Sequence, residues 1–341
     1  MFGYKFRCDI ERDIDNSLAK NRLYVPDRDR LNDPTEMYFD DSEFLDFLNK
    51  HNIYSETVRE LYNSLIDFCK NKCGIFSLSK NVDNELLWAY YANGHRGFCI
   101  EYDIERILEN YNYGLNYKNQ RLESWPLIHL IDVIYQNKFS RFTPEMLKKY
   151  KESNNMTEIL KCIVGTKSKN WEKENEVRLI FNKSGYTELD YRAITGIYFG
   201  CRFDNSSNEI ERIMYLLKGR GIQYYRMKFI NNSYMLGCEK IKDEYHNTPK
   251  YVANNLSYNN IPCLSTPEII KPNKDIIGKA LKFVSQEPCI NKIKSSYITL
   301  SPTPMIAIET YTNPDFNVFP IKTFRFDINL MDRTIKLRRF Q

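Results

Sequence analysis

The stretch GIFSLSKNVDNELLWAYYANGHRGFCIEYD (residues 74–103) decides the fold. Its two ends, GIFSLS (74–79) and GFCIEYD (97–103), are apolar runs of strand length. Between them, NELLWAYYANGH (84–95) has helical apolar spacing and is closed by Gly94, a residue type that favours the left-handed cap at the end of a helix. A helix between two strands predicts a domain in which helices pack on a sheet.

The same kinds of pattern extend on both sides of this stretch. Apolar residues with helical spacing fill residues 42–70, and LNDPTEM (31–37) contains the strong turn former Asn-Asp-Pro. From 104 to 170 the pattern is helical, with breaks at 110–121, Pro126 and Pro144. An amphipathic helix is expected across 207–218. Further strands are predicted at FGYKFR (2–7), RLYVP (22–26), EVRLIFN (176–182), ITGIYFG (194–200) and IQYYRMKF (222–229).

The composition changes after residue 240. Residues 246–272 are polar and contain four prolines, which predicts a linker or an extended loop. A helix at 274–285 and five strand-like runs follow: SYITL, MIAIET, NVFPI, KTFRFDI and TIKLRR. We therefore predict an α+β fold with mixed, mainly antiparallel sheets in residues 1–240, the linker, and a small β-rich domain at 273–341.

Charge and composition restrict the class of protein. The 341 residues include 14% aromatic and 42% hydrophobic residues, which argues against disorder. The net charge of +5, from 49 basic and 44 acidic residues, gives no global field toward nucleic acid or membranes. We see no signal peptide and no run long enough to span a membrane. The nine cysteines, mostly single within apolar stretches, suit reduced core thiols, so we expect a cytoplasmic protein without membrane partners.

The sequence lacks three common motifs for nucleotide binding, hydrolysis and metal binding. There is no G-x-G-x-x-G after a strand, no G-x-S-x-G and no H-E-x-x-H. Cys69 and Cys73 have the spacing of metal ligands on a helix, but no histidine and no second cysteine pair lies near them in the sequence. We therefore expect no structural metal.

Polar residues crowd three strand-like segments where a plain core would avoid them: YKFR (4–7), FSLS (76–79) and WEKENEVRLI (171–180). Ser77 and Ser79 alternate with apolar residues, so both hydroxyls share a strand face, where they could hold a ribose or bond to nearby backbone. Glu174 and Glu176 are spaced by two, as is Glu172 before them, and share a face if the chain is extended there. Close carboxylates suit either a cleft, which would use them to raise one pKa or to meet a cationic centre, or a solvated strand entrance with Arg178 as counter-ion.

Five motifs follow one another along the chain: YKFR (4–7), LNDPTE (31–36), FSLS (76–79), LLWAYYANGHRGFCI (86–100) and KSKNWEKENEVRLI (167–180). In this order they resemble a bacterial family, the domain-of-unknown-function family twenty-nine seventy-one. The resemblance covers roughly residues 1–230 and departs at two positions: Leu31 replaces a phenylalanine, and Tyr90 replaces the histidine of W-x-H-Y-A. If that histidine carries a proton in relatives, a phenol must replace it here or the step is lost.

The order of arginine, Ser-x-Ser and Glu-x-Glu on successive strands is similar to that of the arginine-serine-glutamate ADP-ribosyltransferases. This likeness implies an NAD-dependent ADP-ribosyltransferase or an NAD-cleaving effector, such as a bacterial toxin or a phage-defence protein, with a protein or nucleic acid as acceptor. It implies Glu176 as the catalytic carboxylate, Glu174 as the residue that serves the acceptor, and Ser77 as the ribose-side hydroxyl. NAD would be bound by four further residues: Arg7 at the diphosphate, Ser79, Trp171 and Tyr90.

Two other classes of function stay open at the level of sequence. Asp33, Glu36, Glu174 and Glu176 could hold magnesium in a metal-dependent nuclease. The chain could also be a binding or sensor module without catalysis, for which Tyr90 in place of histidine gives modest support. Asn-Asp-Pro is foremost a turn former, so a structural role is favoured for Asp33 and Glu36.

Overall fold

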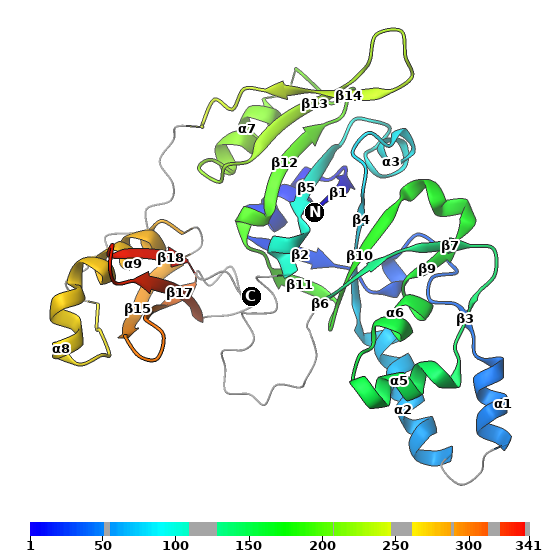
Figure 1. The fold of residues 1–341 in the computed structure, drawn as a ribbon. Coiled ribbons are helices and arrows are strands. Elements are labelled where there is room, and N and C mark those ends of the chain that lie inside the picture. The colour runs from blue at the N-terminus through cyan, green and yellow to red at the C-terminus, as the bar shows by residue number, and fades with distance from the viewer. Residues whose placement is uncertain are drawn as a thin grey trace.

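The structure is a computed structural model that describes residues 1–50, 55–108, 128–206, 208–246, 261–287, 290–312 and 321–337. Within these ranges, helices and strands alternate along the chain, and the predicted α+β class with mainly antiparallel sheets is confirmed (Figure 1). No helix in the described ranges is long and apolar enough to cross a membrane.

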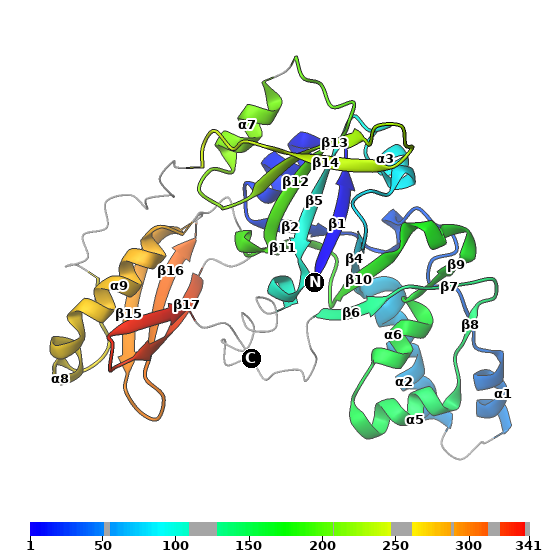
Figure 2. The ribbon, with the colours of Figure 1, turned by 45° about the horizontal axis from the view of Figure 1, so that its top comes forward.

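An eight-stranded sheet organises the larger part of the chain (Figure 2). Its neighbours pair antiparallel except for β12 and β13, which run parallel. The apolar runs quoted from residues 74–103 form two of its inner strands. In spatial order the strands are β14 (Leu236–Ile241), β13 (Gln223–Phe229), β12 (Ile194–Phe199), β5 (Phe98–Asp103), β1 (Phe2–Arg7), β4 (Gly74–Ser79), β10 (Glu176–Phe181) and β6 (Ile128–Asp132).

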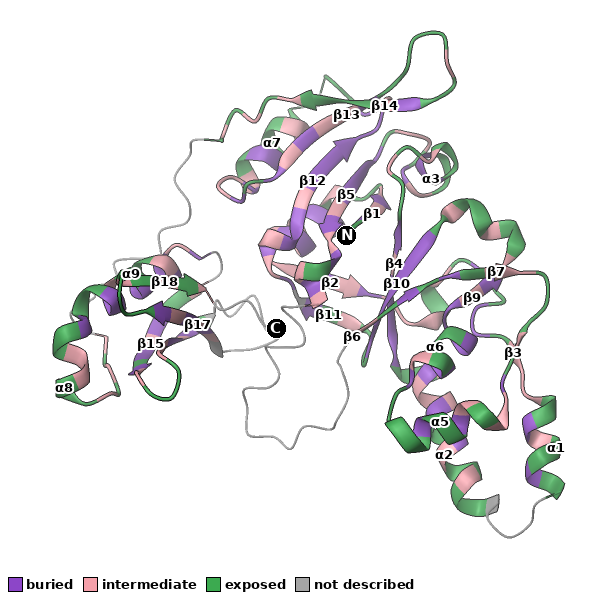
Figure 3. Ribbon diagram, viewed as in Figure 1, coloured by how far each residue is buried: buried purple, intermediate pink, exposed green. Residues whose placement is uncertain are grey.

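Two hydrophobic cores lie on opposite faces of this sheet, because alternate residues of β4 and β10 point to opposite sides. Phe76 and Leu179 pack with η1 (Glu11–Leu18) and α7 (Glu209–Leu216) in the first core. Ile75 and Ile180 pack in the second, with buried residues of four helices. These helices are α1 (Ser42–Lys50), α2 (Ser55–Asp67), α5 (Pro144–Ser153) and α6 (Thr157–Ile163). Figure 3 colours the ribbon by the burial of each residue.

A third, smaller core forms where α3 (Glu85–Tyr91) packs on β1 and β12. Trp88 is fully buried there, and its ring meets Phe6 edge to face. The helix begins at Asn84, whose side chain accepts hydrogen bonds from the next turn, and it ends at Tyr91, before Gly94. This packing holds α3 against β1 and β12.

Short strand pairs complete this part of the chain. They are β2 (Arg22–Val25) with β11 (Gly185–Glu188), β3 (Phe39–Asp40) with β8 (Ser140–Arg141), and β7 (Ile134–Gln136) with β9 (Thr166–Ser168). The helical prediction for 104–170 was therefore wrong at β6, β7, β8 and β9, where chain segments far apart in sequence supply the partners. The breaks predicted at 110–121 and Pro126 lie outside the described residues.

The C-terminal residues have their own core. A four-stranded antiparallel sheet, β15 (Ile290–Thr299), β16 (Met305–Thr312), β17 (Ile321–Asn329) and β18 (Thr334–Leu337), packs against α9 (Lys274–Ser285). Part of the predicted linker belongs to this unit, because Cys263 bridges to Ser296 and α8 (Pro267–Ile270) lies against β15. Residues 247–260 of that linker lie outside the described residues, so its boundaries stay a prediction.

Candidate active site

A cavity of about 200 Å³ opens where two neighbouring strands of the large sheet part. β1 pairs with β4 at a single position, Tyr4 opposite Ser79, whereas it pairs with β5 along its whole length. Tyr4–Arg7 and Ser77–Ser79 therefore line opposite walls of the cavity. We call this cavity the charged lobe; its ionisable side chains include Lys5, Arg7, Arg30, Glu36, Lys167, Glu174 and Glu176.

A second cavity of about 460 Å³ adjoins the charged lobe. Asn32, Leu87, Tyr91 and Glu174 line both, so the two are direct neighbours. We call the second cavity the apolar lobe, because its other walls are mainly large apolar or aromatic side chains. It is further lined by Leu86, Tyr90, Asn170, Trp171 and Lys173.

All seven residues singled out from the sequence line these lobes. Five of them line the charged lobe: Arg7, Ser77, Ser79, Glu174 and Glu176. Trp171 and Tyr90 line the apolar lobe, where Tyr90 is 67% exposed. Residues from β1, β4, α3 and the segment before β10 thus meet at one place.

Arg178 is completely buried and is the partner of two carboxylates that line the charged lobe, Glu36 and Glu176. Its guanidinium donates to both carboxylate oxygens of Glu36, at 2.6 and 2.8 Å, and to both of Glu176, at 2.8 and 3.2 Å. The fifth N–H donates to the carbonyl of Val164 at 2.6 Å. Every donor of this arginine is therefore used. The alternative of a solvated strand entrance was wrong, although Arg178 is the counter-ion of Glu176.

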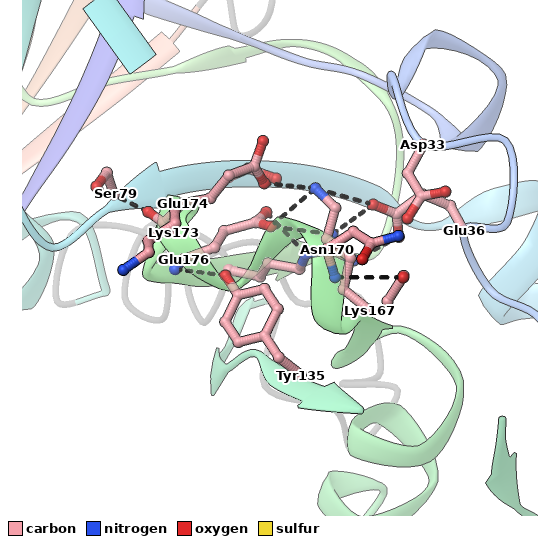
Figure 4. A network of polar contacts seen from close by, with 12 residues as sticks. Asp33, Glu36, Ser79, Tyr135, Lys167, Asn170, Lys173, Glu174 and Glu176 are labelled. Carbon is pink, nitrogen blue, oxygen red and sulfur yellow. Dashed lines mark hydrogen bonds and ion pairs between the residues drawn. The ribbon is translucent and has the colours of Figure 1, made fainter. Parts of the chain in front are cut away.

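Lys167 forms ion pairs with three carboxylates (Figure 4). Its Nζ lies 2.5 Å from Glu174, 3.5 Å from Glu176 and 3.7 Å from Glu36. The ammonium also lies 4.8 Å from the centre of the Trp171 ring. Burial alone would lower the pKa of Lys167, but the charges of Glu176 and Glu174 outweigh it and raise that pKa.

Glu176 is ionised in this setting. Burial by itself would raise its pKa, but the charges of Arg178 and Lys167, with a hydrogen bond from Ser77, lower it to about 2. Its side chain is only 5% exposed. The site therefore holds a fixed negative charge at neutral pH.

Glu174 stands at the junction of the two lobes, and the backbone around it is not extended. Residues Lys169–Glu174 form a 3₁₀ helix, η4, and Asn175 has left-handed backbone angles, so Glu172 turns away and is exposed. The conditional expectation that the three glutamates share one strand face was thus wrong for Glu172. The Ser79 hydroxyl donates to the carbonyl of Glu174 at 2.9 Å and so holds this turn against β4.

Tyr91 donates its hydroxyl to Glu174 at 2.7 Å. Burial and this hydrogen bond raise the pKa of Tyr91. Tyr91, and not Tyr90, is thus the phenol of α3 that contacts a carboxylate of the site.

Sequence reasoning missed Lys5 and Lys167, which line the charged lobe. It also missed the pairing of Glu36 with Arg178. Asp33 does form a turn, accepting from the backbone and hydroxyl of Thr35, as Asn-Asp-Pro predicts. Glu36 instead reaches across to β10. The signal available was the placement of Glu36 and Lys167 inside two of the five quoted motifs.

The family comparison matches the segment that carries the carboxylates. Residues 87–179 match the model of a family described as protein of unknown function (DUF2971). This segment of the chain is therefore similar to the DUF2971 family. The match includes most of α3, Lys167, Glu174, Glu176 and Arg178, while Arg7, Glu36 and the two serines precede it. No curated protein and no solved structure matches the chain.

Proposed function

We propose that this protein cleaves the bond between nicotinamide and ribose in NAD and transfers the ADP-ribosyl group to water or to a macromolecular acceptor. The observation that carries the proposal is the meeting of Arg7, Ser77 and Glu176 in one charged cavity that adjoins an aromatic one. A dinucleotide has the same succession of anionic, sugar and aromatic parts. The apolar lobe alone is within the size range of small-molecule sites, roughly 300–1,000 Å³.

The charges suggest how NAD would lie. Arg7, with Lys5 and Arg30, supplies cationic donors for the diphosphate at one end of the charged lobe. The nicotinamide would enter the apolar lobe, against Trp171 and beside Tyr90. The ribose between them would come to the glutamates, with the Ser77 hydroxyl on its side.

The chemistry requires negative charge beside the sugar. The C1′–N bond breaks with its electron pair leaving on the nicotinamide nitrogen, and C1′ gains positive charge. Glu176, ionised and held by Arg178, would stabilise that charge without reorganising. A new bond then forms from C1′ to the oxygen of water or to an acceptor atom. The proton released by this nucleophile would pass to Glu174, which lines both lobes.

Purified protein with NAD, with and without cell extract, tests the proposal. Release of nicotinamide, measured by chromatography, is the expected result, and a labelled adenosine would mark any acceptor. NAD that stays intact under both conditions would contradict it. Expression in cells should also deplete NAD if the protein acts as a toxin or defence effector.

The nuclease alternative finds less support in the site. Glu36, Glu174 and Glu176 do converge, but around Lys167 and Arg178, whose positive charges occupy the place a magnesium ion would need. Asp33 uses one carboxylate oxygen for its own turn. Nucleic-acid cleavage that a chelator abolishes would nonetheless restore this alternative.

A further inference from the structure

Lys5 occupies an unusual place in the charged lobe. Its Nζ donates to the carbonyl of Ser77 at 2.6 Å and lies 5.1 Å from the centre of the Phe76 ring. Within the described ranges, no ion pair joins Lys5 to a carboxylate, in contrast to Lys167. Lys5 therefore bridges the two parted strands and keeps two of its donor positions for another partner.

Arg7 is the second cation on the same wall. It follows Lys5 by two residues on β1, and both line the lobe. Its Nε lies 3.4 Å from Asp13 of η1, so one edge of the guanidinium is held in place. Two cations two residues apart on a strand suit the two phosphates of a diphosphate.

The titratable groups around Lys5 come from several elements. They are Arg7 on its own strand, Asp13 on η1, Glu174 at the end of η4, Glu176 on β10 and the thiol of Cys99 on β5. Burial, followed by the charge of Arg7, lowers the pKa of Lys5 to about 7, and the carboxylates only partly oppose this. At neutral pH the neutral amine and the ammonium form of Lys5 are therefore both populated.

We propose that Lys5 and Arg7 form a two-cation subsite for the diphosphate of a nucleotide and that binding loads a proton onto Lys5. This assignment rests on the proposed function for the identity of the ligand as NAD, but the subsite itself recognises any nucleotide with an internal diphosphate. The neutral amine can keep its hydrogen bond to Ser77, so the empty protein stays folded at higher pH. A bound dianion favours the ammonium and raises the pKa of Lys5.

The affinity of the subsite for a diphosphate should fall as pH rises above 7. Below pH 7 most of the Lys5 amine is already protonated, so binding takes up little additional proton. Above pH 7 binding takes up close to one proton, and affinity falls by up to about tenfold for each pH unit. A subsite made of arginine alone would show no such change.

Calorimetry with ADP-ribose at pH 6, 7 and 8, in two buffers of different ionisation enthalpy, tests the assignment. ADP-ribose is the suitable probe because it carries the internal diphosphate and lacks the bond to be cleaved. We expect proton uptake to rise from pH 6 to pH 8 as affinity falls. Lys5→Met should bind weakly at all three pH values without this uptake, whereas Lys5→Arg should bind with little dependence on pH. Lys72→Met, at an exposed lysine paired with Asp67, is the matched control and should behave as wild type.

The outcomes separate the two proposals. ADP-ribose binding with Lys5-dependent proton uptake, but no release of nicotinamide from NAD, would contradict the function and keep the subsite. Proton uptake that persists in Lys5→Met and Lys5→Arg, equal affinity from pH 6 to pH 8, or no binding of ADP-ribose would overturn the subsite. If Lys5→Met fails to fold, the comparison of Lys5→Arg with wild type decides.

Discussion

Glu174 and Glu176 show how much the role of a single residue depends on its partners. They are two positions apart, yet Glu176 accepts hydrogen bonds from Arg178, whereas Glu174 accepts one from the hydroxyl of Tyr91. Glu174 lines both lobes, whereas Glu176 lines the charged lobe alone. The two carboxylates are therefore expected to serve different steps.

Glu176→Gln should lower the rate of nicotinamide release by roughly a hundredfold or more, because it removes the charge beside the ribosyl cation and keeps the size. Glu174→Gln should impair transfer to an acceptor more than hydrolysis of NAD. Initial rates of both reactions, measured on variants whose circular dichroism matches wild type, check this. Glu172→Gln is the control, since Glu172 is exposed. Wild-type rates in Glu176→Gln would remove this carboxylate from the mechanism.

Arg178→Met should destabilise the fold by about 3–5 kcal/mol, because it leaves Glu36 and Glu176 buried with reduced compensation. Urea unfolding followed by fluorescence measures the loss. Arg141→Met removes an exposed arginine and should change stability by less than about 0.5 kcal/mol. Similar small effects for both variants would show that the buried network adds little to stability.

The network also predicts how stability responds to acid. The pKa of Glu176 falls from 4.5 to about 2 on folding, so its contribution is fully present above pH 4.5 and is lost as pH falls toward 2. The difference in unfolding free energy between wild type and Glu176→Gln should therefore shrink between pH 6 and pH 3. A difference that stays constant over this range would mean that the carboxylate is not held by its cations.

At the scale of elements, the pairing of β1 with β5 places Arg7 and Lys5 at the cavity. Arg7 lies opposite Phe98, and the chain before Phe98 passes very close to β1. A Cβ on Gly97 would lie 2.1 Å from the carbonyl oxygen of Arg7 and 3.0 Å from the backbone of Ala92. Only glycine allows this approach of β5, β1 and the end of α3.

Gly97→Ala should therefore destabilise the protein and weaken ADP-ribose binding, because β1 must shift at Arg7. A loss of about 1–3 kcal/mol, typical of overpacking, is expected in thermal or urea unfolding. Gly278→Ala is the matched control: it lies in α9 with nothing within 4 Å of its added Cβ and should be neutral or stabilising by up to about 1 kcal/mol. Equal stability of Gly97→Ala and wild type would contradict the close approach.

At the scale of the whole molecule, the chain has separate cores. Buried apolar side chains of the large sheet form three clusters within residues 6–236, and those of the C-terminal sheet form one within 276–328. Arg192 joins the two parts, because it pairs with Glu287 and lies over the ring of Phe283. A polar contact of this kind suits two units that fold around their own cores.

Limited proteolysis should cut first within residues 247–260, the proline-containing and polar segment between the cores, and give two stable fragments. Mass spectrometry of the early products locates the cut. Early cleavage within residues 70–200, with that junction protected, would contradict the two-unit organisation. In that event the C-terminal sheet would have to be treated as part of one larger domain.

The sequence by itself determined the segments that have a strong local period and the residues that stand out against it. GIFSLS, GFCIEYD and the helix at 274–285 were predicted at or within one residue of the strands and helix that form, because alternation and helical spacing are local properties. Arg7, Ser77 and the two glutamates could be selected because polar residues in apolar strands are conspicuous. Their order along the chain added the family resemblance.

Only the tertiary structure decided which of these residues act together. The strands between 128 and 168 depend on partners distant in sequence, so their short and polar segments resemble helix or loop when read alone. Glu36 and Arg178 are 142 positions apart, and no local pattern can join them. A buried charge is stable only with its partner, so the folding that buries Arg178 also brings Glu36, Glu176 and Lys167 to one place and shapes the cavity beside them.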